Sequence, residues 1–242
     1  MIEEVKPFDF KPGEVILIDK DLEWTSFDVV KKIRNFLWSL TRIKKLKVGH
    51  AGTLDPMASG LLVICTGKAT KQIEEIQAGV KEYITTLKLG ATTPSFDLET
   101  GEDQQFPTDH ITEEFFRTTI QKFIGEIDQV PPVYSAVKVN GQRAYEFARA
   151  GNHVELKSKK LVIDELEVLC FSPTEAKLRI VCSKGTYIRA LARDIGLALK
   201  SGAYLTCLRR TQIGPYNVED ALSVADFMKK VEEVGTIREV ES

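Results

Sequence analysis

The chain has 242 residues, of which 43% are hydrophobic and 28% are charged, and its formal net charge is −2 at pH 7. These values are typical of a globular protein with one large domain, or one domain with a small appendage. No apolar run approaches the ~20 residues of a membrane-spanning helix. The first residues, MIEEVKPFDF, carry acids where a secretory signal carries basic residues, so a cytoplasmic location without a membrane partner is expected.

Charge is distributed unevenly along the chain. Seven basic residues and no acid occur from Val29 to Lys47, whereas seven acids and no lysine or arginine occur from Asp97 to Glu114. Further basic groups occur from Lys138 to Lys160 and from Lys184 to Arg193. Any one cluster is typical of a solvated surface. Together, the basic clusters would form a phosphate-binding face despite the near-neutral total charge.

The cysteines are too dispersed to suggest a zinc site. None of Cys65, Cys170, Cys182 and Cys207 forms a CxxC pair. Because all but Cys207 lie in apolar, strand-like runs, we expect reduced structural thiols that are buried.

The first third of the chain alternates between strand and helix patterns. The run VILID is short and β-branched, and Thr25–Ser26 then offers a cap for a helix whose apolar residues recur at helical spacing. The expected elements are a strand at Val15–Asp19, a helix at Phe27–Trp38, a strand at Leu61–Cys65, a helix at Ala69–Ala78 and a strand at Tyr83–Leu89.

The remaining two thirds mix hairpins with helices. Thr92–Pro107 is polar and acidic, which predicts an exposed loop, and Thr112 caps a helix that Gly125 is expected to end. The other expected elements are a strand at Val133–Val139 with a hairpin turn at Asn140–Gly141, a helix at Ala144–Ala150, strands at Leu161–Phe171 and Lys177–Cys182, and helices at Tyr187–Lys200 and Leu222–Val234. Because hairpins interrupt the alternation, the sequence predicts an α+β fold with a mixed sheet.

One segment has the composition of a functional loop. Gly49–Gly60 reads GHAGTLDPMASG, in which glycines allow a chain path that side chains would obstruct and Pro56 fixes the backbone after Asp55. Such a loop can present the Asp55 carboxylate as a nucleophile or a general base. A structural turn in which Asp55 caps its neighbours fits the same residues. His50 is either a general base or a residue that positions or stacks on RNA.

This segment resembles the GHxGTLDPxAxG signature of the TruB family of tRNA pseudouridine synthases. The other family blocks follow in the same order, so that the resemblance covers about residues 13–222. These blocks are Gly13–Ser26, Lys81–Tyr83 with Leu89–Gly90, Val130–Gly151, Ser183–Arg189 (SKGTYIR), and Leu208–Arg210 with Gly214.

The resemblance implies a fold, a domain plan and a reaction. The fold is a mixed, mostly antiparallel central sheet flanked by helices, with an active-site cleft across the sheet. The catalytic domain would span residues 1–222, and residues 223–242 would form a short helical tail without the PUA RNA-binding domain of many family members. The reaction is isomerisation of uridine to pseudouridine at position 55 of the tRNA T loop, with base flipping.

The resemblance also implies the partners and the cofactor requirement. The partner is tRNA, held by its T-arm stem-loop, and the reaction requires neither a cofactor nor a metal. No protein partner is implied, and a monomer is the default. Two alternatives remain from the residues alone: an enzyme that releases the free base with the same carboxylate, and a module that binds or folds RNA without turnover.

Residue roles follow from the same match. Asp55 would be the nucleophile, and Arg189 would pair with it and keep it ionised. Tyr83 would stack on the target base and abstract its C5 proton. The residues implied to contact the substrate are His50, Tyr187, Leu208, Lys20, Gly52 and Thr53.

The chain departs from the family pattern in three places. Asp19–Ser26 lacks the proline and glycine of the usual DKPxGxTS block, which leaves the loop conformation open. Phe36–Lys47 is longer and more basic than usual. In Thr93–Asp97, Pro94 replaces an acid of the usual T-D-T-x-D loop, while Asp97 is retained.

Overall fold

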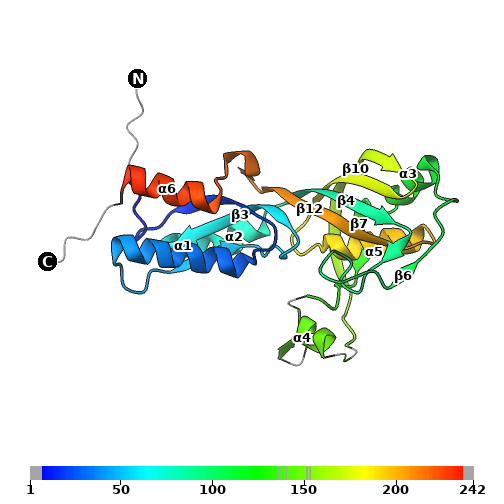
Figure 1. Cartoon of the computed structure of the whole chain (residues 1–242), viewed down its shortest axis with the longest axis horizontal. Helices are drawn as coiled ribbons and strands as arrows, with labels where there is room; N and C mark the ends of the chain where they lie inside the picture. Colours follow the sequence, from blue (N-terminus) through cyan, green and yellow to red (C-terminus); the bar gives the residue numbers. More distant parts are fainter. Residues whose placement is uncertain (1–6, 136, 140, 151, 153, 237–242) are drawn as a thin grey trace, which may run out of the picture. The chain divides into compact units, whose positions relative to one another are not determined.

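A computed structural model describes residues 7–135, 137–139, 141–150, 152 and 154–236 (Figure 1). The chain divides into two compact units, which are described separately. Unit 1 comprises Met1–Gly79 and Arg209–Ser242, and unit 2 comprises Val80–Leu208. Strand β12 (Ala203–Ile213) begins in unit 2 and ends in unit 1. In the part of the chain that the structure describes, no helix is long and apolar enough to cross a membrane.

Unit 1 is built on the buried strand β3 (Ser59–Thr66). β3 pairs antiparallel with β1 and β2, and its start pairs parallel with β12, where Gly60 lies opposite Arg210. The other elements of unit 1 are β1 (Val15–Lys20), α1 (Ser26–Thr41), β2 (Val48–Ala51), the 3-10 helix η1 (Gly67–Gln72), α2 (Ile73–Ala78), β13 (Tyr216–Asn217), the 3-10 helix η2 (Val218–Asp220) and α6 (Val224–Val234).

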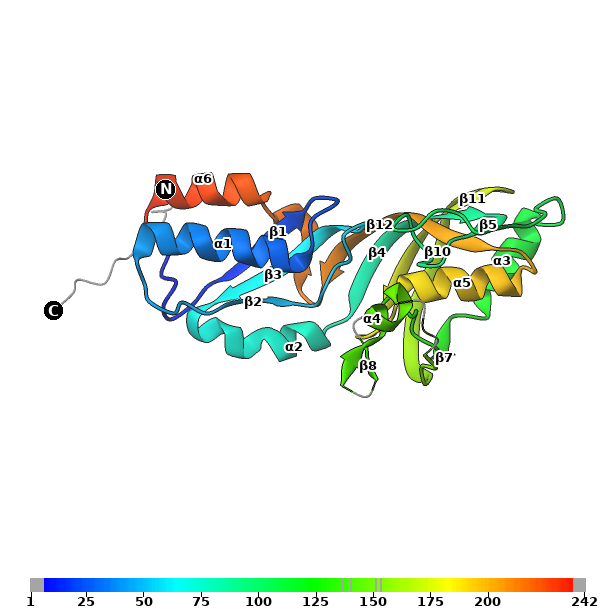
Figure 2. The ribbon, with the colours of Figure 1, turned by 60° about the horizontal axis from the view of Figure 1, so that its bottom comes forward.

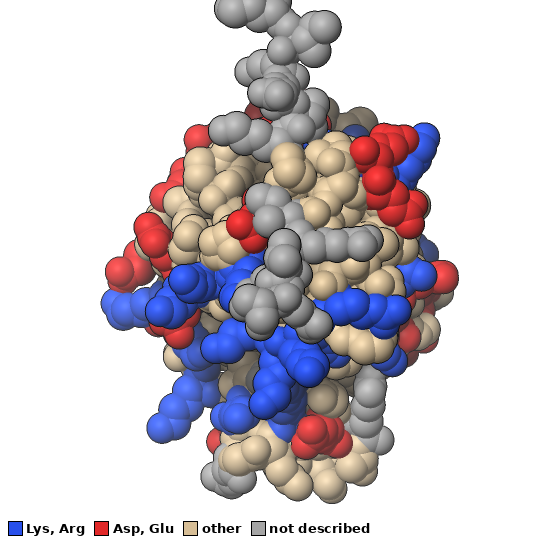
Figure 3. Space-filling view, turned by 90° about the vertical axis from the view of Figure 1, so that its left-hand side faces the viewer, with Lys and Arg blue, Asp and Glu red and all other residues tan. Residues whose placement is uncertain are grey.

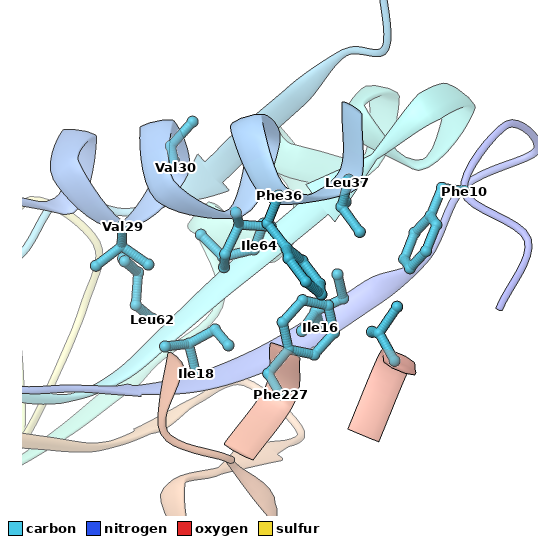
Figure 4. Close-up of a cluster of buried hydrophobic side chains, with 12 residues drawn as sticks. Phe10, Ile16, Ile18, Val29, Val30, Phe36, Leu37, Leu62, Ile64 and Phe227 are labelled. Atoms are coloured by element: carbon cyan, nitrogen blue, oxygen red, sulfur yellow. The ribbon is translucent and has the colours of Figure 1, made fainter. Parts of the chain in front are cut away.

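Both faces of β3 are covered, which explains its unbroken apolar run. Leu62 and Ile64 point into a core formed with α1 and α6, where Phe227 of α6 is buried (Figure 4). The alternate residues Leu61 and Val63 belong to a second core that includes Ile76 of α2. The strand period of two therefore sorts neighbouring side chains into separate cores.

Unit 2 contains a sheet with the strand order β12-β4-β11-β10-β7. β4 pairs antiparallel with β11, β11 with β10, and β10 with β7. Its elements are β4 (Lys81–Leu89), β5 (Ala91–Thr92), β6 (Gln104–Gln105), α3 (Glu113–Gln121), β7 (Gly125–Gln129), β8 (Lys138–Val139), β9 (Gln142–Arg143), α4 (Ala144–Arg149), β10 (Lys159–Ser172), β11 (Glu175–Cys182) and α5 (Ile188–Ala198). Figure 2 shows α5 lying along this sheet.

The expected fold class and most expected elements are confirmed. The sheets are mixed and largely antiparallel, with helices on their faces. The helix after Thr25 begins with the expected capping box, in which Thr25 and Asp28 each bond the other's backbone N–H. Several expected elements start or end a few residues away from their predicted bounds, as is usual for helix and strand ends.

Some expectations were wrong. The helix after Thr112 ends at Gln121, and Gly125 instead begins β7, where its φ of 95° suits glycine. Ala69–Ala78 is a 3-10 turn followed by a short α-helix. Among the described residues of Val133–Val139, only Lys138–Val139 form a strand, which pairs across the hairpin. Asn140 lies outside the described residues.

Two burial expectations also need correction. Cys65 and Cys182 are buried, but Cys170 is exposed, because the long strand β10 turns this side chain outward. Thr92–Pro107 is not exposed throughout, since Thr93, Ser95 and Asp97 are buried. The sequence also did not predict β12, the strand that belongs to both units.

Replacing Gly60 tests the close contact between β3 and β12. A Cβ at Gly60 would lie 2.2 Å from the Arg210 carbonyl oxygen, and its φ of 101° disfavours other residues. We expect Gly60→Ala to lower the free energy of unfolding by at least about 2 kcal/mol, through strain and a backbone shift. Urea unfolding followed by circular dichroism measures this change.

Gly101→Ala is the matched control, because no atom lies within 4 Å of a Cβ built there. Its unfolding midpoint should change little. Equal midpoints for the two variants would contradict the proposed close approach of Arg210.

Candidate active site

Asp55 lies in unit 1 on the loop between β2 and β3, with hydrogen bonds on both sides of it. The Leu54 N–H donates to Ser26 Oγ at 2.8 Å, and Ser26 Oγ donates to the Leu54 carbonyl at 3.0 Å. The Glu23 N–H donates to the Pro56 carbonyl at 2.8 Å, and the Ala58 N–H donates to that of Asp55 at 3.1 Å. The loop therefore holds the half-buried Asp55 carboxylate on a fixed backbone.

Arg210 holds the same loop through hydrogen bonds to backbone carbonyls. Its side chain is 1% exposed. Nη2 donates to the Gly52 carbonyl at 3.0 Å, Nη1 to that of Thr53 at 3.3 Å and Nε to that of Leu61 at 2.9 Å. One guanidinium thus joins the start of the loop to β3. Gly52 has a φ of 89°, so the conformational need for glycine inferred from the sequence is confirmed there.

Lys20 ends β1 and is fully buried, with an exposure of 0%. Its Nζ donates to the carbonyls of Asp21 at 2.8 Å and Trp24 at 2.7 Å, which shapes the loop before α1. Burial lowers the pKa of Lys20 from 10.5 to about 8, while the negative charge of Asp55 acts in the opposite direction. The charges of Lys20 and Asp55 are therefore coupled within unit 1.

His50 lies on β2, opposite Ile64 of β3. Burial, followed by the positive charge of Arg210, lowers the pKa of His50, so that the imidazole is mostly neutral at pH 7. A backbone hydrogen bond with Gly52 acts in the opposite direction on this pKa. The buried Nδ1 has no hydrogen-bond partner among the described residues, so this nitrogen can bind a ligand or exchange a proton.

The other predicted catalytic residues lie in unit 2. Tyr83 is a buried residue of β4, opposite Ile180 of β11. Arg189 lies in the first turn of α5 and is 3% exposed. Its Nη1 donates to the Ser95 carbonyl at 3.1 Å and its Nη2 to the Tyr134 carbonyl at 2.8 Å.

Asp97 links Arg189 to the acidic loop. Its carboxylate oxygen lies 3.5 Å from Arg189 Nε, and the Asp97 side chain is itself buried. The other carboxylate oxygen of Asp97 accepts bonds from Ser95 Oγ at 2.5 Å and from the Glu99 N–H at 3.0 Å. This ion pair explains why part of a loop that is polar in sequence is buried.

The two remaining predicted residues of unit 2 lie at the start of α5 and in β12. Tyr187 is the N-cap of α5, and its backbone exchanges two bonds with the side chain of Gln129, at 2.9 and 3.2 Å. Leu208 is a buried residue of β12.

The structure therefore brings the predicted residues together in two groups. Lys20, His50, Gly52, Thr53 and Asp55 are joined within unit 1 by backbone adjacency, the bonds of Arg210 and the coupling of Lys20 to Asp55. The remaining predicted residues belong to unit 2. The pairing of Asp55 with Arg189 would join the two units and stays a prediction.

Sequence reasoning missed the roles of Arg210 and Ser26. Arg210 occurs in a quoted family block, but no role was assigned to it. The available signal was an arginine pair inside AYLTCLRRTQI, a run that otherwise suits a half-buried strand. The sequence pattern indicates Ser26 only as part of a helix cap. Its bonds to Leu54, which lies 28 positions later, depend on the tertiary fold.

Comparison with known proteins identifies the class to which this fold and loop belong. The model described as "TruB family pseudouridylate synthase (N terminal domain)" matches residues 39–188. The model described as "tRNA pseudouridylate synthase B C-terminal domain" matches residues 189–239. These matches place the chain among the pseudouridylate synthases. The chain belongs to the TruB family.

Relatives named tRNA pseudouridine synthase B match over nearly their whole length. The protein of Phocaeicola vulgatus is 59% identical over 231 residues, which are 93% of this chain and 98% of the relative. That of Flavobacterium johnsoniae is 52% identical over 227 residues, or 93% and 99% of the two chains.

Solved structures share the fold over about half of their own length. A chain of a Cbf5-Nop10-Gar1 complex is similar with a TM-score of 0.69 and 30% identity, covering 91% of this chain and 54% of that one. A chain of an H/ACA RNP bound to a substrate RNA containing 2'-deoxyuridine gives a TM-score of 0.65 and 28% identity, covering 89% and 52%.

Within the described ranges, no group of three or more histidine, cysteine, aspartate or glutamate residues could hold a metal ion.

Replacing Asp55 tests its coupling to Lys20. Asp55→Asn removes a charge that raises the pKa of Lys20, so we expect that pKa to fall further below about 8. Side-chain NMR titration of the Lys20 ammonium measures the shift. Asp103→Asn, at an exposed position of unit 2, is the control. An unchanged Lys20 pKa in Asp55→Asn would show that the two side chains are not coupled.

The same titration predicts how stability depends on pH. The folded pKa of Lys20, about 8, lies below the reference value of 10.5, so the unfolded chain binds this proton more tightly. The contribution of Lys20 therefore makes folding more favourable as the pH rises from about 8 to 10.5.

Replacing Asp97 tests the buried ion pair with Arg189. Asp97→Ala leaves a buried guanidinium without its carboxylate, and we expect the free energy of unfolding to fall by about 3 kcal/mol. The exposed Asp103, whose carboxylate accepts a bond from Thr92 Oγ1 at 2.6 Å, is the control. Thermal unfolding should separate the variants clearly, and similar losses for Asp97→Ala and Asp103→Ala would contradict a structural role for the pair.

Proposed function

We propose that this chain isomerises uridine to pseudouridine in tRNA. Membership of the TruB family and the close relatives named tRNA pseudouridine synthase B support this activity. In the reaction the N1–C1′ bond breaks and a C5–C1′ bond forms. The C5 proton leaves and N1 gains a proton, so that nothing is added to or lost from the RNA overall.

Asp55 is the proposed nucleophile. The observation that supports it best is the fixed loop, whose backbone bonds to Ser26 and Arg210 flank this one carboxylate. Two buried cations, Lys20 and Arg210, supply positive charge to the surroundings of the loop. Positive charge close to the loop attracts a carboxylate and helps to orient it for attack on the substrate.

The target uridine must leave its stack to reach Asp55, which costs a few kcal/mol. His50 offers a buried, unused nitrogen beside the loop. On the family pattern, Tyr83 stacks on the base and acts on its C5 proton, while Tyr187 and Leu208 line the uracil pocket and Arg189 pairs with Asp55. These roles, and the T-loop position of the uridine, form part of the proposal.

Exposed apolar side chains near the loop can replace the lost stacking. Trp24 and Phe27 are 38% and 62% exposed. Both belong to the segment that Glu23 and Ser26 tie to the Asp55 loop. An exposed aromatic ring stacks on any nucleobase and stabilises the open form of an RNA loop.

The direct test is Asp55→Asn, which keeps the side-chain shape but removes the nucleophile. We expect no detectable pseudouridine, and RNA affinity within a few-fold of wild type, because the bonds of Ser26, Glu23 and Arg210 that hold the loop do not use the carboxylate. The assay measures tritium release from 5-labelled uridine in a T-arm hairpin, and filter binding measures affinity. Asp109→Asn, at an exposed position of unit 2, is the control and should retain full turnover.

The same assay separates the alternatives. Chromatography of the products distinguishes pseudouridine within the RNA from free uracil, which a base-releasing enzyme would produce. Turnover by Asp55→Asn at the wild-type rate would exclude Asp55 as the nucleophile. Tight RNA binding without any tritium release by the wild-type chain would favour a binding module.

A further inference from the structure

Three loops of unit 1 meet at the end of the unit where α1 terminates. The Gly67 N–H donates to the Lys47 carbonyl at 2.9 Å, and the Lys68 N–H donates to that of Lys11 at 3.4 Å. A Cβ on Gly67 would lie 2.4 Å from the Phe10 carbonyl oxygen. The loop at residues 10–13, the loop at residues 42–47 and the start of η1 therefore form one continuous surface.

This surface carries a concentration of exposed cations. We call it the basic end patch and define it by the exposed residues Lys11, Trp38, Arg42, Lys44, Lys45 and Lys68. Figure 3 shows Lys and Arg side chains gathered on this end of unit 1. The acids of the first loop are engaged locally, since Asp9 accepts a bond from the Lys11 N–H at 3.3 Å and Glu14 from the Asp9 N–H at 2.9 Å.

An aromatic ring lies among these cations. Trp38, on the last full turn of α1, is 53% exposed, and the Arg42 guanidinium carbon lies 4.9 Å from its ring centroid. An exposed indole next to arginine and lysine is a combination that binds unpaired nucleotides, because the ring stacks on a base and the cations contact phosphates.

The loop that carries these cations has a defined conformation. Arg42 and Lys45 have φ values of 57° and 59°, a region that costs a non-glycine residue about 1 kcal/mol or more. The Arg42 N–H caps α1 by donating to the Trp38 carbonyl at 3.0 Å. Thr41 Oγ1 accepts from the Ile43 N–H at 3.2 Å, which fixes the next step. The lysines therefore project from an ordered turn.

The basic end patch is remote from Asp55 within the same unit. Ser26, the first residue of α1, bonds Leu54 next to Asp55. The helix has 16 residues, so at about 1.5 Å per residue its other end lies ~24 Å away. A nucleotide at Asp55 cannot also contact this patch, so different nucleotides of the RNA must occupy the two places.

We propose that the basic end patch is a second RNA-binding surface, which holds phosphates and an unpaired base of the tRNA outside the stem-loop that contains the target uridine. The tRNA as occupant rests on the proposed function, whereas the preference for RNA rests on the charge and the exposed indole. A membrane surface fits less well, because the apolar face of α1 is buried in the core with Ile33 and Leu37.

The test reverses charge on the patch and compares two RNA ligands. The variant combines Lys44→Glu, Lys45→Glu and Lys68→Glu, and a second variant is Trp38→Ala. The matched control combines Lys122→Glu, Lys177→Glu and Lys200→Glu, which are exposed residues of unit 2. Filter binding measures the Kd for full-length tRNA and for an isolated T-arm hairpin across a salt series, and circular dichroism checks that each variant is folded.

We expect the patch variant to bind full-length tRNA at least about tenfold more weakly and to reduce its salt slope by about 2–3, since each lost phosphate contact contributes slightly less than one. Trp38→Ala should weaken tRNA binding several-fold with little change in that slope. Hairpin binding should be unchanged in both, and the control variant should lose less than the patch variant on tRNA.

Two outcomes would overturn the proposal. Either the patch variants bind full-length tRNA as wild type does, or they lose as much affinity for the hairpin as for tRNA. The first outcome would indicate that the basic end patch binds an acidic protein or an anionic membrane instead of RNA. If the wild-type chain makes no pseudouridine while the patch variants still lose tRNA affinity, the proposed function fails and the second surface remains.

Discussion

The buried guanidinium of Arg210 is the interaction on which the local architecture of unit 1 depends most. It supplies donors to carbonyls of the Asp55 loop and of β3 at the same time. A buried arginine is stable only when its N–H groups are bonded, so the loop and the strand must keep this geometry together. Gly60 makes this possible, because only a residue without a Cβ allows the backbone of Arg210 to approach so closely.

The sequence indicates the carboxylate and its loop, but not what holds them. The glycines and Pro56 predict an unusual turn, and helical periodicity predicts α1, because both are local properties. The contacts of Arg210 with Gly52 and of Ser26 with Leu54 connect residues 158 and 28 positions apart. β12 was also missed, because two arginines interrupt its alternation, and the burial of Arg210 becomes favourable only after β3 and the Asp55 loop provide carbonyl acceptors.

The acidic loop of unit 2 likewise depends on a contact with a residue far away in the sequence, which local patterns do not predict. Its composition predicts exposure, since seven acids lie between Asp97 and Glu114 without a cation. The cation that buries Asp97 is Arg189, which the resemblance had assigned to Asp55 alone. Arg189 also donates to the carbonyls of Ser95 and Tyr134, so its side chain is held in place within unit 2. An arginine fixed in this way loses little conformational freedom when it binds a further anion.

The structure shows which bonds hold the segment that departs from the DKPxGxTS block. Glu23 occupies the place of the usual glycine and keeps a φ of 68°, the left-handed conformation that glycine would adopt more easily. Its N–H bonds the Pro56 carbonyl, and Lys20 bonds the carbonyls of Asp21 and Trp24 on either side. These bonds offset the strain of the left-handed conformation at Glu23. The conformation of the segment next to Asp55 is therefore maintained by tertiary hydrogen bonds rather than by local residue preference.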